Sequence, residues 1–145
     1  MLSDEITSYE DFFTWCSTLG LVRDLQIAQA FGRTTQTVRN WKGLPAGHPS
    51  GLMPLHLILA CKGYEVSSRR TGKLVPPFPE MSITWFEMWC GAHGLDTLAG
   101  IGNAFGLTRQ AVHSWHKRGQ TPRWLPLACL GYEAGIPRGR AKRRG

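Results

Sequence analysis

Two short polar segments carry the side chains best suited to hydrogen-bond another molecule. The first segment is TTQTVRN, at residues 34–40, and the second is TRQAVHS, at residues 108–114. Glutamine can pair bidentately with adenine and arginine with guanine, and each good pair contributes roughly 1–3 kcal/mol of discrimination. On its own, a polar helix face is more often solvated surface. The elements around the two segments must therefore decide whether they form a recognition surface.

Both segments belong to an internal repeat. The segment from Trp15 to Trp41 recurs as the segment from Trp89 to Trp115. Its small and apolar residues, including the AFG triplet, Val38 and Trp41, recur at a constant offset of 74 positions. The match resumes as LACKGYE at 59–65 and LACLGYE at 127–133, now 68 positions apart. The second copy thus lacks six residues between its third and fourth elements.

Each copy is expected to be helical. Ser8 and Ser82 are predicted N-caps of the first helices, and Gly20 and Gly94 are expected to end them. Second helices are predicted at about 24–31 and 98–105, and third helices at about 35–42 and 109–117. Fourth helices are expected to begin near Pro54 and Pro122 and to end at Gly63 and Gly131, with Pro126 bending the last helix.

A glycine-containing turn followed by a helix that begins with Thr is a helix-turn-helix arrangement. The fold class is therefore predicted to be all-α, with two tandem four-to-five-helix helix-turn-helix domains joined by a Pro-rich linker. The expected boundaries are 8–65 for the first domain, 66–80 for the linker, 81–135 for the second domain and 136–145 for a basic tail.

Within each copy, a small residue at Ala28 or Gly102 would let the two helices approach. A set of apolar residues would fill the wedge between them: Ile27, Phe31, Val38 and Trp41 in the first copy, and Ile101, Phe105, Val112 and Trp115 in the second. This pattern resembles the Cro and phage-repressor type of DNA-binding domain, the Xre-like family, over about residues 21–63 and 95–131. LTRQAVHSWHKRG resembles it most closely. Arg33 departs from this pattern, because the equivalent residue of the second copy is the apolar Leu107. Arg33 is therefore expected to point at a phosphate and not into the core.

The resemblance implies that the third helix of each copy enters the major groove of DNA. Carried over position by position, the DNA-binding residues of the first copy are Thr34 as helix cap with Thr35, Gln36, Arg39 and Asn40. In the second copy they are Thr108 as cap with Arg109, Gln110, His113, Ser114 and Lys117. Trp41 and Trp115 are expected to pack in the core, whereas the unmatched Trp85 and Trp124 are candidates for a contact between modules or with a partner.

The net charge of +7 is concentrated at the end of the chain, where residues 136–145 hold five basic residues and no acidic one. Such a tail suits a polyanion, because each neutralised phosphate releases counterions. Its DNA-contacting residues are predicted to be Arg138, Arg140, Lys142, Arg143 and Arg144. A solubilising tail is the plainer alternative.

Other classes of function have little support in the sequence. No signal peptide or membrane-spanning run is recognisable, so a cytoplasmic, nucleoid-associated place in a bacterium or phage-infected host is expected. The four Cys residues are interpreted as buried thiols, and no metal, cofactor or catalytic site is predicted, which makes an enzyme the least supported class.

We therefore expect a sequence-specific protein that binds double-stranded DNA, such as a phage- or mobile-element-type transcriptional regulator or repressor acting as a covalent pseudo-dimer. Two alternatives stay open: a protein-interaction module serving as adaptor, antitoxin or inhibitor of a defence complex, and an architectural or single-strand binder. A homodimer or a protein partner is compatible with each of these hypotheses.

Overall fold

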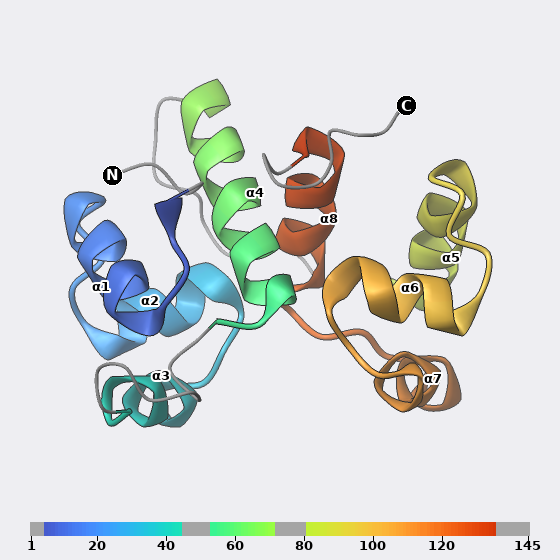
Figure 1. Ribbon diagram of the computed structural model, residues 1–145, viewed down its shortest axis with the longest axis horizontal. Coiled ribbons are helices and arrows are strands. Elements are labelled where there is room, and N and C mark those ends of the chain that lie inside the picture. The colour runs from blue at the N-terminus through green and yellow to red at the C-terminus, as the bar shows by residue number, and fades with distance from the viewer. Residues whose placement is uncertain (1–4, 45–52, 72–80, 136–145) are drawn as a thin grey trace.

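The chain is all-helical in the computed structural model, which describes residues 5–44, 53–71 and 81–135. Its described part contains eight α-helices: α1 (Tyr9–Thr18), α2 (Asp24–Phe31), α3 (Thr35–Lys42), α4 (Leu55–Thr71), α5 (Ile83–Ala92), α6 (Leu98–Phe105), α7 (Arg109–Arg118) and α8 (Leu125–Ala134). Helices α4 and α8 lie side by side at the centre, with α1–α3 on one side and α5–α7 on the other (Figure 1). None of the helices described is long and apolar enough to cross a membrane.

The local signals in the sequence correctly located the first three helices of each copy. Ser8 accepts a hydrogen bond from the backbone N–H of Asp11, and Ser82 accepts one from that of Trp85, so both are N-caps. Gly32 and Gly106 end α2 and α6 with left-handed φ angles of 66° and 68°. A glycine is required at these turns because other side chains resist that backbone conformation.

The predicted ends of the fourth helices were wrong. Helix α4 continues past Gly63 to Thr71, and α8 continues past Gly131 to Ala134. Residues 66–71 of the predicted linker are therefore helical, while 72–80 lie outside the described residues. Pro126 is the second residue of α8, a first-turn position where its missing N–H costs no helical hydrogen bond.

Each copy builds the same aromatic core. The ring centroid of Phe12 lies 5.3 Å from that of Phe31 and 5.7 Å from that of Trp41. At the equivalent positions, Phe86 lies 6.2 Å from Phe105 and 5.8 Å from Trp115. The cores are nevertheless not separate, because Leu127 of α8 packs in the first cluster and Leu59 of α4 packs in the second.

Two glycines allow α4 and α8 to pack closely. A Cβ at Gly63 would overlap the carbonyl oxygen of Leu127, and a Cβ at Gly131 would overlap that of Leu59. Gly63 and Gly131 are equivalent in the repeat, as are Leu59 and Leu127. The contact is therefore reciprocal, as in an isologous interface across a twofold axis.

The same reciprocity holds further along the contact. A Cβ at Gly32, at the end of α2, would lie 2.7 Å from the backbone of Arg123 and Trp124. At the equivalent Gly106, a Cβ would lie 2.6 Å from the Cβ of Leu55. Each helix-turn-helix turn thus rests on the beginning of the other copy's last helix, so the α4–α8 pair sets the position of both turns.

This close packing predicts that Gly131→Ala is destabilising. The added methyl group meets backbone rather than a movable side chain, so we expect a loss of about 1–3 kcal/mol or more in the free energy of unfolding measured with urea. Gly91→Ala is the matched control, because Gly91 also lies in a helix but a Cβ there meets nothing within 4 Å. That variant should be neutral or more stable by up to about 1 kcal/mol. Equal stabilities of the two variants would contradict the packing role.

Candidate nucleic-acid interface

Two equivalent turns join α2 to α3 and α6 to α7. The backbone N–H of Arg33 donates to the carbonyl of Ala28 at 2.8 Å, and that of Leu107 donates to Gly102 at 2.7 Å. A Cβ at Gly102 would lie 2.6 Å from the carbonyl oxygen of Leu107, which explains why a very small residue stands there. Both copies therefore fold into a helix, a tight turn and a second helix of the kind that the sequence predicts.

The residues predicted to fill the wedge between these helices do so. Their relative exposures are 7 % or less, except for Trp41, which is half-buried. Trp41 stacks on Tyr9 with a ring-centroid distance of 5.2 Å, and Trp115 contacts Trp124 at 5.9 Å. Both tryptophans are thus packing residues, as expected.

Helix α3 begins at a cap and carries its polar side chains outward. The Thr34 hydroxyl accepts from the backbone N–H of Thr37 at 3.1 Å. Gln36, Arg39 and Asn40 are exposed and Thr35 is half-buried. The amide of Gln36 donates to the side-chain oxygen of Asn40 at 3.0 Å, so these two side chains are oriented by each other.

Helix α7 has the same plan with different groups. The Thr108 hydroxyl accepts from the backbone N–H of Ala111 at 3.1 Å. Four of the predicted DNA-binding residues of this helix are exposed: Arg109, Gln110, His113 and Lys117. Ser114 is half-buried and donates its hydroxyl back to the Ala111 carbonyl at 2.8 Å, so it is the least available of the set.

The two helices lie at the same edge of the molecule, on opposite sides of the α4–α8 pair (Figure 1). Beside α7, a cavity of about 230 Å³ is lined by Leu98, Arg109, Gln110 and His113. The exposed polar side chains of α3 and α7 therefore lie at one edge of the molecule (Figure 1).

Arg33 does not take the position expected for a phosphate contact. Its guanidinium lies 5.5 Å from the ring centroid of Trp41 and 5.0 Å from that of Trp124, and its Nη2 donates to Nδ1 of His56 at 3.1 Å. Burial lowers the pKa of Arg33 to about 10. The side chain is half-buried in the contact between the two copies, where its charge is stabilised by the two rings, although its Nε has no hydrogen-bond partner among the described residues.

His56 and Trp124 occupy equivalent repeat positions and meet each other, with ring centroids 4.5 Å apart. Trp124 is thus a contact between the copies. Trp85, the other unmatched tryptophan, is 53 % exposed on α5, near Met88 at 70 %. Trp85 therefore lies on the surface and not in the contact between the copies.

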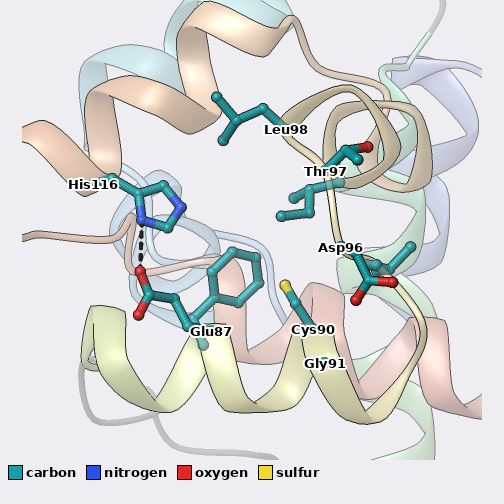
Figure 2. Close-up of a pocket in the computed structure, with 10 residues that line it drawn as sticks. Glu87, Cys90, Gly91, Asp96, Thr97, Leu98 and His116 are labelled. Atoms are coloured by element: carbon teal, nitrogen blue, oxygen red, sulfur yellow. Dashed lines mark ion pairs between the residues drawn. The ribbon is translucent and has the colours of Figure 1, made fainter.

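A second cavity, of about 320 Å³, lies between α5, α6 and α7. Figure 2 shows His116 of α7 and Glu87 of α5 facing each other beside it, with their Nδ1 and Oε2 atoms 2.9 Å apart. At the equivalent positions, Lys42 lies 5.4 Å from the ring of Phe13. A polar pair thus fixes α7 against α5 where a cation–π contact fixes α3 against α1.

The cysteines are buried free thiols. Burial raises the pKa of Cys16 to about 12 and that of Cys90 to about 11, so both stay protonated near neutral pH. In the described part of the chain, no three His, Cys, Asp or Glu side chains are placed to hold a metal ion. The predicted tail contacts Arg138, Arg140, Lys142, Arg143 and Arg144 lie outside the described residues.

Asp24 contacts the candidate interface and is not among the residues predicted from the sequence. Its carboxylate lies 2.6 Å from Nζ of Lys42 and 3.6 Å from Nε of Arg39. The available signal was the difference between the copies, since Leu98 stands at the equivalent position. Its partners became visible only when α2 and α3 were packed together.

Comparison of the chain with protein-family models, curated proteins and solved structures found no match. The assignment of function therefore depends on the geometry of the site.

The junction at His56 predicts a specific pH dependence. Burial, with a smaller contribution from the Arg33 charge, lowers the pKa of His56 to about 4, whereas histidine in an unfolded chain titrates near 6.5. Between these values the unfolded chain binds a proton that the folded chain does not. Stability should therefore fall as pH falls through this window.

His56→Gln isolates this contribution, because the carboxylates that also titrate there are the same in both proteins. From pH 6.5 down to about 4, unfolding free energies should fall more steeply for the native chain, by up to about 1.4 kcal/mol per pH unit. Above pH 7 the two curves should run parallel. Parallel curves over the whole range would show that His56 is not held neutral.

Proposed function

We propose that this protein binds duplex DNA sequence-specifically, through α3 and α7 together. The observation that carries the proposal is the placement of two equivalent helix-turn-helix units, with their second helices at one edge, on a reciprocal contact between α4 and α8 (Figure 1). Proteins that read DNA with such helices commonly dimerise so that two of them meet successive major-groove faces about 34 Å apart. Here a single chain would supply both helices and act as a covalent pseudo-dimer.

In this proposal the repeats at 8–65 and 81–135 are two tandem helix-turn-helix domains, and the linker predicted over 66–80 begins within the last turns of α4. The resemblance to the Cro and phage-repressor family supports a transcriptional regulator or repressor of phage or mobile-element type, acting in the cytoplasm at the nucleoid and not as an enzyme. The basic tail would follow the phosphate backbone or enter a neighbouring minor groove.

The two reading surfaces differ in chemistry, so the preferred DNA site would be asymmetric. Helix α3 offers Gln36, Arg39 and Asn40, whereas α7 offers Arg109, Gln110 and His113. Arginine favours guanine and glutamine favours adenine. The proposal therefore requires a site of two unlike half-sites.

A protein-interaction module is the second candidate, and one observation favours it. Trp85 and Met88 are exposed on the outer face of α5, whereas the equivalent residues on α1 are Asp11 and Thr14. Exposed aromatic and Met side chains are common at protein–protein interfaces. In that case the chain would show no preference among duplex sequences.

Substitution of the two arginines tests the assignment of the reading helices. Arg39→Ala should weaken one half-site and Arg109→Ala the other, each by about 5- to 150-fold, corresponding to one lost bidentate pair of roughly 1–3 kcal/mol. Footprinting on a preferred duplex and binding to duplexes altered in one half-site would measure this.

Arg118→Ala is the charge-matched control, since Arg118 is exposed at the end of α7 and is not assigned to a base. It should lower affinity equally for all sequences or leave it unchanged. Should both Arg39→Ala and Arg109→Ala leave the footprint intact, the assignment of the reading residues would be wrong.

A further inference from the structure

We propose that Asp24 determines the DNA specificity of α3. It would do so by positioning Arg39 for a base and by disfavouring contacts between α3 and the phosphate backbone. This inference rests on the proposed DNA binding. Asp24 is the first residue of α2, and its side chain is 27 % exposed. It is a positioning residue, since it would act on DNA through Arg39 and Lys42.

The geometry leaves Arg39 available for a base. The contact with Asp24 uses Nε, at 3.6 Å, and the Arg39 side chain remains 61 % exposed. The terminal nitrogens of the guanidinium are the groups that can pair with O6 and N7 of guanine. An arginine already restrained by a carboxylate has fewer orientations to lose when it binds, so the contact favours one docking geometry over the others.

The charge of Asp24 also favours contact with a base over contact with a phosphate. Arg39 and Lys42 are the two basic residues of α3, and one carboxylate contacts both, with Lys42 at 2.6 Å. A phosphate approaching these cations would meet the negative charge of Asp24, whereas a base edge is neutral. Exposed ion pairs contribute little to stability, so selectivity is the stronger consequence of this contact.

The second copy provides an internal comparison. Leu98 replaces Asp24, His113 replaces Arg39 and His116 replaces Lys42. His116 pairs with Glu87 of α5. In the described part of the chain, Arg109, Gln110 and Lys117 of α7 form no hydrogen bond or ion pair through their side chains. Under this proposal α7 contributes more of the sequence-independent affinity, and α3 contributes more of the discrimination.

Asp24→Asn tests the inference, because it keeps the size of the side chain and removes its charge. Binding of the full chain would be measured by fluorescence anisotropy against salt on three probes: the duplex preferred by the native chain, the same duplex with the base opposite Arg39 replaced, and a duplex of unrelated sequence. We expect affinity for the unrelated duplex to rise and its salt dependence to steepen by about one unit of log K against log salt. Discrimination at the base opposite Arg39 should fall about threefold or more.

Asp96→Asn is the matched control, since it removes the same charge from an exposed residue of the second copy. It should leave discrimination at that base unchanged. In an Arg39→Ala background, Asp24→Asn should have no further effect on discrimination, whereas a merely structural role would persist there. Thermal unfolding of each variant would verify that its fold is retained.

The outcomes separate the two levels of the proposal. If Asp24→Asn matches the native chain in both discrimination and salt dependence, Asp24 has no such role while DNA binding stands. If the native chain itself binds every duplex equally or none at all, the proposed function fails and this inference fails with it.

Discussion

The structure depends on the close approach of α4 and α8. These helices can approach only because Gly63 and Gly131 present no Cβ to the backbone carbonyls of Leu127 and Leu59. Across this contact Leu127 packs in the first cluster and Leu59 in the second, each 2 % exposed, and full burial of such a side chain contributes roughly 1.5–3 kcal/mol. Because each turn also rests on the start of the other copy's last helix, this one contact sets the relative position of the two candidate reading helices.

The two copies share one reciprocal core but present different exposed side chains. In the proposed function, this difference would give the duplication a role beyond stability. The residues that hold each helix pair together are retained between the copies, as in Phe31 and Phe105 or Val38 and Val112. The exposed residues differ, and so do the contacts that restrain them: Asp24 contacts two cations of α3, while Glu87 contacts one histidine of α7. In the proposed function, the core would thus be symmetric and the recognition asymmetric.

Much of the fold could be predicted from the sequence, because caps, left-handed glycines and the repeat are local signals. Ser8 and Ser82 each occupy the predicted role, and Gly32 and Gly106 are the glycines of the two predicted helix-turn-helix turns. The errors arose where one residue type serves two purposes. Glycine ends helices and also permits close packing, so the sequence predicts a helix end at Gly63 where the structure has a close contact with the backbone of Leu127. Arg33 suits a phosphate and equally suits a stack between tryptophans, and only the neighbouring copy supplies Trp124. Asp24 and Arg39 are 15 positions apart, and nothing local in the sequence joins them.

Sequence-specific binding by a covalent pseudo-dimer is tested most directly by selecting bound fragments from a random duplex library and measuring the mass of the complex. We expect an enriched motif of two unlike parts, bound by one chain per duplex. Enrichment of two identical half-sites bound by two chains would contradict the covalent pseudo-dimer. Absence of any enriched motif would contradict sequence-specific DNA binding and favour the protein-interaction alternative.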